Sequence, residues 1–208
     1  MQCHIIGIGG PTCGGKTTAS KMIVDKFKNV GVTMYSIDRR YKGGGPETNY
    51  DVPEALDIKG SISDLTNLKN GIPIDAPIYN FKTHRPEGTE KIYPNPIIIV
   101  EGILIFCIPE LREIFDFKIY VDCYPELRFY RRMTRDTKER GRDEQEVCNR
   151  YFRDVVPSNT SYVEPSKNYC DVILQNNNMH EFIGIDLILS HIKITLKKIN
   201  KNLKKLED

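Results

Sequence analysis

Several features that would direct a sequence to other classes of protein are missing from this chain of 208 residues. Its 30 basic and 28 acidic residues nearly cancel, so no overall charge favours a nucleic-acid or membrane partner. No apolar run approaches the roughly 20 residues of a membrane-spanning helix, and the amino terminus shows neither a basic flank nor a cleavage site. The six cysteines are scattered without metal-ligand spacing, which favours reduced thiols and a cytoplasmic location. The length predicts a single domain over 1–208.

Glycine is concentrated in one short stretch near the amino terminus, residues 9–18. From Gly10 this stretch has the pattern G-x-x-x-x-G-K-T of a phosphate-binding loop. An apolar run over 4–8 precedes it, and helical periodicity over 17–28 follows it. This strand–loop–helix order directs backbone N–H groups and the positive end of a helix dipole at an anion. A glycine-rich turn before an ordinary helix is the alternative, which the Lys-Thr pair in register disfavours.

The loop predicts that ATP binds here. Lys16 is expected to reach the β- and γ-phosphates, and the Thr17 hydroxyl to bind Mg²⁺. The loop residues expected to contact the nucleotide are Gly10, Pro11, Thr12, Cys13, Gly14, Gly15, Lys16, Thr17 and Thr18.

Two further predicted strands, 32–37 and 96–100, are each followed by an acid, Asp38 and Glu101. In open α/β sheets, ligands bind beyond the carboxyl ends of the strands. Glu101 is therefore a candidate Mg²⁺ ligand, with a surface ion pair as the alternative. Strands are also expected over 117–122 and 170–174, which with the first strand makes five in an α/β fold.

Three other segments have clear patterns. Residues 61–68 predict a short helix with Ser61 and Asp64 as candidate caps. The proline-punctuated segment 71–93 predicts a β-hairpin that projects from the main sheet. Residues 179–206 predict an amphipathic helix, which either packs on the sheet or lies on a membrane surface; packing on the sheet is the favoured interpretation.

Five arginines are concentrated in residues 131–142, within a helical and strongly charged region. Such a run is usually a solvated helix face. Gly141 interrupts the helix, however, and guanidinium groups match phosphate oxygens, so a lid that closes on the triphosphate is the competing interpretation. A nucleic-acid patch is disfavoured because acids are interleaved.

Several motifs in order resemble the uridine kinase (uridine-cytidine kinase) family of P-loop nucleoside kinases, from about residue 5 to about residue 189. After the phosphate loop they are Asp38-Arg39-Arg40-Tyr41, the box over 49–57, the segment over 77–85, Glu101-Gly102-Ile103, the lid signature over 131–143 and the segment over 164–171.

The resemblance implies a P-loop kinase fold with a five-stranded parallel sheet flanked by helices, a β-hairpin insertion (71–93) and an arginine-rich lid (131–143). It implies phosphorylation of uridine and cytidine on the ribose 5′-hydroxyl, with ATP and Mg²⁺ and Asp38 as general base. Implied catalytic residues are Asp38, Lys16 and Arg135; Mg²⁺ residues are Thr17, Glu101 and Asp38. Implied nucleotide contacts from the lid are Arg132, Arg135 and Arg140. Implied nucleoside contacts are Asp51, Tyr41, Tyr79, Phe81, His84, Arg132, Arg142 and Arg150. A homo-oligomer, tetrameric in the family, is also implied, with no nucleic-acid or membrane partner.

The chain departs from the family pattern at several positions. Pro11 has no N–H to offer a phosphate. Arg39 and Arg40 replace a small-aromatic pair, which predicts either a lowered pKa of Asp38 or an added phosphate contact. Arg150 stands where a Gln is common near the ribose, and Asn80 replaces an Asp. A related small-molecule kinase (phosphoribulokinase, pantothenate kinase or nicotinamide riboside kinase type) and a catalytically weak nucleotide-binding regulator remain alternatives.

Overall fold

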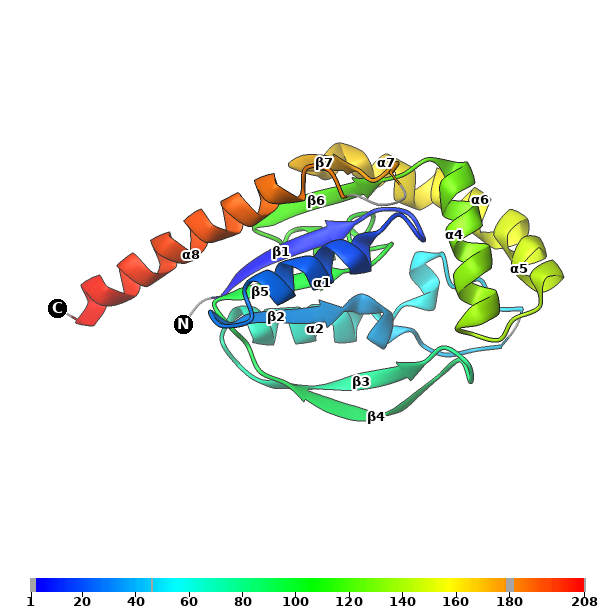
Figure 1. Ribbon diagram of the computed structural model, residues 1–208. Helices are drawn as coiled ribbons and strands as arrows, with labels where there is room; N and C mark the ends of the chain where they lie inside the picture. Colours follow the sequence, from blue (N-terminus) through cyan, green and yellow to red (C-terminus); the bar gives the residue numbers. More distant parts are fainter. Residues whose placement is uncertain (1–2, 46, 179–181, 208) are drawn as a thin grey trace.

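The computed structural model describes residues 3–45, 47–178 and 182–207. Parallel strands form its central sheet in the order β2-β5-β1-β6-β7 (Figure 1). The strands span His4–Gly9 (β1), Val32–Ser36 (β2), Ile97–Glu101 (β5), Phe117–Asp122 (β6) and Val172–Gln175 (β7). The predicted α/β fold with a five-stranded parallel sheet is confirmed, whereas the single domain over 1–208 stays a prediction.

Helices cover both faces of the sheet, and the two core layers explain why the central strands are apolar throughout. On one face, Ile6 and Ile97 pack with helices α1 (Lys16–Lys26) and α8 (Ile185–Glu207). On the other face, Ile5 and Ile98 pack with α2 (Ile58–Lys69) and α3 (Pro109–Arg112). Because every residue of β5 is buried, its first four residues form a continuous apolar run rather than an alternating one, and Glu101 is the buried acid at its end.

The apolar stripe of α8 packs on the sheet over its described side chains from Ile185 to Leu196, as predicted. Ile188 and Ile192 are buried in the core layer that α1 also covers. The far end of the helix extends beyond the sheet (Figure 1). Residues 179–181 of the predicted helix lie outside the described part of the chain. Across the described residues, none of the helices combines the length and hydrophobicity needed to cross a bilayer.

The caps predicted for α2 are wrong. The helix begins three residues earlier than predicted, and its N-cap is Asp57, whose carboxylate accepts a hydrogen bond from the Gly60 N–H at 3.0 Å. Ser61 and Asp64 lie inside the helix and are buried. Asp64 instead accepts hydrogen bonds from the Tyr35 hydroxyl at 2.6 Å and from Arg40. A capping residue and a buried ion-pair residue are both polar, so composition alone did not separate them.

The predicted hairpin is confirmed. Strands β3 (Ile74–Asn80) and β4 (Arg85–Ile92) pair in antiparallel register as a separate two-stranded sheet. The hairpin lies beyond α2 and β2, on the side away from β7 (Figure 1).

The arginine-rich region forms one helix, a turn and a long helical arm. Helix α4 spans Pro125–Lys138, and the turn at 139–143 contains Gly141 with a φ of 66°. The helical arm (residues 144–169) consists of α5 (Glu144–Arg150), π-helical Tyr151–Val155, α6 (Val156–Ser158), π-helical Asn159–Val163, α7 (Glu164–Ser166) and a 3₁₀ turn, Lys167–Tyr169. The predicted break at Gly141 is therefore confirmed.

Candidate active site

The phosphate loop has a backbone conformation that requires glycine at two positions. Gly10 has a φ of 129°, and a Cβ placed on it would lie 2.3 Å from the Val121 carbonyl oxygen. Gly15 has a φ of 109° and forms the N-cap of α1. Glycine adopts these positive φ values without strain, whereas a residue with a side chain would not. The two glycines therefore allow the loop to turn its N–H groups toward the start of α1, where an anion is favoured.

Pro11 takes part in the loop through its carbonyl oxygen. That oxygen accepts hydrogen bonds from the Gly14 N–H at 3.1 Å and from the Lys16 ammonium at 2.9 Å. Lys16 is buried, and burial lowers the pKa of its ammonium while Glu101 and Asp38 raise it. The proline thus closes the loop, and its missing N–H leaves this geometry intact.

Asn176 also supports the loop, although no specific pattern in the sequence indicates this residue. Its side-chain amide donates a hydrogen bond to the Gly14 carbonyl at 2.7 Å, and it is buried beyond the end of β7. Its position after a strand at the carboxyl edge of the sheet is the one general indication that could have identified it.

The candidate metal ligands gather beside the loop. Glu101 is buried at the end of β5 and accepts a hydrogen bond from the Ser36 hydroxyl at 2.6 Å. Asp38 lies in the 3₁₀ turn Ile37–Arg40, which follows β2. Both acids line one cavity together with Lys16 and Thr17. Within the described residues, no three His, Cys, Asp or Glu side chains form a metal-binding group. Two carboxylates and a hydroxyl are nevertheless a donor set that fits Mg²⁺ completed by phosphate oxygens and water.

The expectation that Arg39 and Arg40 lower the pKa of Asp38 is wrong. Burial, and next the carboxylate of Glu101, raise the pKa of Asp38 to about 7. The cations that oppose this rise are Lys16, Arg140 and Arg135.

Both residues of the arginine pair have other partners. Arg40 forms an ion pair with buried Asp64 at 2.6 Å, and Arg39 forms one with Glu90 at 2.7 Å. Arg39 also donates to the Pro77 carbonyl oxygen at 3.3 Å. Their side chains therefore brace α2 and the hairpin, and neither lines the described cavities.

We expect Arg40→Gln to lower the free energy of unfolding by about 1–3 kcal/mol, because the buried Asp64 carboxylate would lose its charged partner. Arg39→Gln removes a more exposed pair and should cost about 0.5 kcal/mol. Chemical denaturation measures both. Neither change should alter kcat by more than about twofold, since neither side chain lines the two cavities. A large fall in kcat for Arg40→Gln would show that it does act on Asp38.

A second cavity adjoins the first and shares Asp38 with it. Its wall is aromatic: the rings of Tyr41 and Tyr79 lie 5.5 Å apart, those of Tyr79 and Phe81 lie 5.2 Å apart, and His84 stacks on Tyr50 at 5.2 Å. Burial, and then the nearby arginines, lower the pKa of His84, which keeps its imidazole neutral near pH 7. A neutral imidazole can both donate and accept a hydrogen bond.

Asp51 also lines this second cavity. Burial raises the pKa of its carboxyl, and the positive charge that opposes the rise most strongly is that of Arg132. The structure brings Asp51 together with the aromatic residues predicted at 41, 79, 81 and 84. Tyr50 completes this wall and was not among the predicted site residues.

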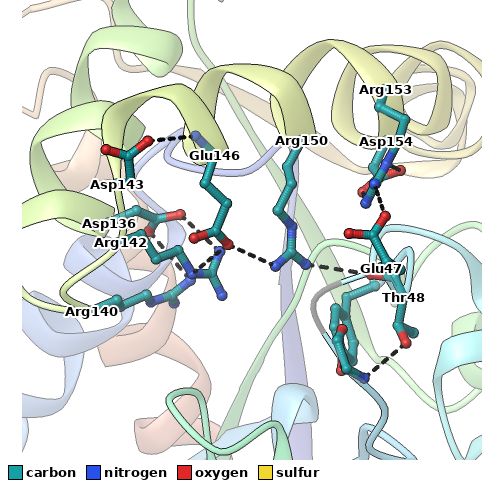
Figure 2. Close-up of polar contacts among 12 residues, drawn as sticks. Glu47, Thr48, Asp136, Arg140, Arg142, Asp143, Glu146, Arg150, Arg153 and Asp154 are labelled. Atoms are coloured by element: carbon teal, nitrogen blue, oxygen red, sulfur yellow. Dashed lines mark hydrogen bonds and ion pairs between the residues drawn. The ribbon is translucent and has the colours of Figure 1, made fainter.

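Asp136 is the centre of the arginine-rich segment 131–143, which is predicted to be a lid. Its carboxylate is fully buried and lies 2.8 Å from Arg135, 3.3 Å from Arg140, 3.4 Å from Arg142 and 3.6 Å from Arg132. Figure 2 shows Arg140 and Arg142 converging on it. Burial alone would raise the pKa of Asp136. The nearby guanidinium groups lower it by more than burial raises it, so the pKa of Asp136 is below the ordinary value. This arrangement contradicts the solvated-face interpretation, and Asp136 itself was missed as a site residue.

The lid arginines reach both cavities. Arg132 donates to the Thr12 hydroxyl at 3.2 Å, and the Arg140 guanidinium lies 4.5 Å from the centre of the Phe81 ring. The lid therefore lies over the phosphate loop and the hairpin at the same time. The predicted arginines at 132, 135, 140, 142 and 150 all line the second cavity.

A phosphate loop before α1, one acid after β2 and another at the end of β5, an arginine cluster and an adjoining aromatic cavity on a parallel sheet are the features of a P-loop kinase. The chain belongs to the phosphoribulokinase / uridine kinase family, whose model matches residues 5–182. ATP use follows from that membership.

Individual relatives agree with this assignment. The chain is 40% identical over 202 residues to a uridine kinase of Clostridium botulinum (strain Okra / Type B1), covering 93% of this chain and 98% of the relative. It is 41% identical over 201 residues to a uridine kinase of Clostridium perfringens (strain 13 / Type A), covering 93% and 96%. It is therefore a kinase of this family.

Solved structures show the same fold at low identity. A phosphoribulokinase from Rhodobacter spheroides superposes with a TM-score of 0.63 at 12% identity, covering 88% of this chain and 74% of that one. A D-glycerate 3-kinase from Cryptococcus neoformans superposes with a TM-score of 0.62 at 13% identity, covering 88% and 89%. Because these kinases are named for different acceptors, the fold alone does not identify the substrate.

Proposed function

We propose that this protein transfers the γ-phosphoryl group of ATP to the 5′-hydroxyl of uridine and cytidine. The observation that supports it best is the position of Asp38, which lines both the cavity of the phosphate loop and the aromatic cavity. An acceptor hydroxyl held between the two would lie next to a carboxylate with a pKa of about 7. A general base works best when its pKa is near the working pH. The identity of about 40% to proteins named uridine kinase supports the choice of acceptor.

Each group of residues has a proposed role. Lys16 and the loop N–H groups would neutralise the phosphates, and Arg132, Arg135 and Arg140 would close over them. Thr17 and Glu101, with Asp38 nearby, would hold Mg²⁺, which supplies charge neutralisation at the transferred phosphoryl group. Asp38 would accept the proton of the 5′-hydroxyl as its oxygen attacks phosphorus.

The nucleoside would lie against the aromatic wall. The Asp51 carboxylate would accept hydrogen bonds from the ribose hydroxyls, while Tyr79 and Phe81 contact the base and His84 reads its polar edge. Tyr41, Arg142 and Arg150 would complete the acceptor site. A role in pyrimidine salvage, a cytoplasmic location and a homotetramer are proposed with this function on the basis of the family resemblance.

An acceptor panel tests the proposal. ADP release with Mg²⁺-ATP should be detected with uridine and cytidine and should be at background with adenosine, thymidine, nicotinamide riboside and ribulose 5-phosphate. A site whose buried polar groups are left unpaired by a wrong acceptor discriminates by about 10⁴-fold. Turnover of another acceptor alone would overturn the assignment of uridine and cytidine as acceptors while leaving the kinase chemistry. Tight ATP binding without turnover of any acceptor would indicate a regulatory nucleotide-binding protein.

A further inference from the structure

The helical arm contacts the chain segment that holds Asp51. This segment, residues 47–51, is fastened to the arm at three points. Arg153 pairs with Glu47, Arg150 donates to the Thr48 carbonyl at 3.4 Å, and the Asn49 amide donates to the Ser158 hydroxyl at 3.1 Å. Figure 2 shows Arg150 and Arg153 pointing from the arm toward this segment.

The segment in turn positions the sugar-binding carboxylate. The Asn49 side chain accepts a hydrogen bond from the backbone N–H of Asp51 at 2.9 Å. The Arg150 guanidinium also lies 5.8 Å from the centre of the Tyr50 ring. A shift of the arm would therefore move Asp51 and the aromatic wall together.

Glu146 lies between Arg142 of the lid and Arg150, which holds residues 47–51 to the arm. One of its carboxylate oxygens is 3.5 Å from the Arg150 guanidinium and 4.0 Å from that of Arg142. Arg142 pairs at its other side with Asp136. Figure 2 shows the resulting line of polar contacts, in which Asp136, Arg142, Glu146 and Arg150 alternate in charge and Arg150 ends at the Thr48 carbonyl.

The charge of Glu146 matters because its two partners repel each other. Arg142 and Arg150 are both about nine-tenths buried, with side-chain exposures of 10% and 7%. Burial lowers the pKa of Arg142, and the next largest cause is the positive charge of Arg150. A single carboxylate that contacts both cations offsets this repulsion and keeps the lid next to the arm.

We propose that Glu146 is a positioning residue that couples closure of the arginine lid on ATP to the placement of residues 47–51 around the acceptor. The proposal rests on the proposed function, in which the lid meets ATP and Asp51 meets the sugar. ATP and the nucleoside then bind cooperatively, and by linkage each tightens the other by the same factor.

Hydrogen exchange tests the coupling without any nucleoside. In the parent protein, a non-hydrolysable ATP analogue with Mg²⁺ should slow amide exchange in the lid and also in residues 47–51. In Glu146→Gln, the analogue should still slow exchange in the lid but leave residues 47–51 unchanged. The matched control is Glu144→Gln on the same helix: this acid is exposed and has no hydrogen bond or ion pair to any described residue. It should behave as the parent does. Protection of residues 47–51 by the analogue in Glu146→Gln would overturn the proposal, as would its absence in the parent.

Binding measurements give the size of the effect. Saturating uridine should tighten the analogue's Kd by about fivefold or more in the parent and in Glu144→Gln. In Glu146→Gln this ratio should fall to near one, whereas Glu146→Asp should restore part of it. A merely structural role would lower both affinities and leave the ratio unchanged. If uridine and cytidine neither bind nor react, the proposed function fails, and the exchange experiment still decides the coupling.

Discussion

Asp38→Asn lowers kcat for uridine by about 10²–10⁴-fold, the usual contribution of a general base. Asn keeps the size and shape of the side chain, but its neutral amide cannot accept the proton of the 5′-hydroxyl. The loss should appear in kcat, measured at saturating ATP and nucleoside, with KM changed only a few-fold. That division identifies a group that acts in the transition state.

The same substitution should stabilise the ligand-free protein at high pH. The folded-state pKa of Asp38, about 7, is above the unfolded value of 3.8, so the ionised carboxylate destabilises the fold. This cost is absent below about pH 4, grows between pH 4 and 7 and is complete above pH 7. Asp38→Asn should therefore raise the free energy of unfolding by about 1–3 kcal/mol at pH 8 and by little at pH 4, in denaturant titrations.

Asp122→Asn is the matched control for both measurements. Asp122 lies at the same edge of the sheet, at the end of β6, but it pairs with Lys167 at 2.7 Å and does not line the described cavities. Its kcat should stay within about twofold of the parent value. If Asp38→Asn retains most of the activity, the proton acceptor is another group. If it does not stabilise the protein at pH 8, the acid is not held in a destabilising environment.

The features that the sequence predicted well are those with a local physical cause. The phosphate loop follows from two glycines that need positive φ values, and the buried strand β5 from an unbroken apolar run. The hairpin follows from proline and β-branched residues in short alternation. Each of these three features can be predicted from its own residues, because its cause does not involve contacts with distant parts of the chain.

The missed features depend on partners distant in sequence. The ion pair of Arg40 with Asp64 joins residues 24 positions apart, so the sequence showed two arginines beside Asp38 but not that they turn away from it. Asn176 meets Gly14 across 162 positions. Such contacts are fixed by the topology of the sheet and by helix packing, neither of which a local pattern contains.

The lid lies between these two cases. Its five arginines were visible in the sequence, but charge composition could not tell a solvated face from a buried cluster. The deciding residue is Asp136, which is one acid among several in that segment and the one that is fully buried among four guanidinium groups.

Asp136→Asn should have a large effect on both stability and activity. The neutral amide leaves four arginines without their common counter-charge, and breaking such a buried pairing costs about 3–5 kcal/mol. Because the pKa of Asp136 is lowered in the fold, its contribution is complete above the unfolded value of 3.8 and is lost as the pH falls through the folded pKa. The stability difference between parent and variant should therefore be large at pH 7 and shrink below about pH 4.

The activity of Asp136→Asn should fall by about 10²-fold in kcat/KM for ATP, because misplacing a charged group by about 1 Å costs that much. Repulsion would drive the arginines apart, so the loss should grow smaller as added salt screens it. Glu126→Gln, an exposed change on the same helix, is the control and should leave kcat/KM within about twofold. Measurements at 10 °C as well as 25 °C separate a misplaced lid from an unfolded protein, since the folded variant would still show the defect. A folded Asp136→Asn enzyme with parental kcat/KM would mean that the arginines find their places without a central anion, and that phosphate alone organises them.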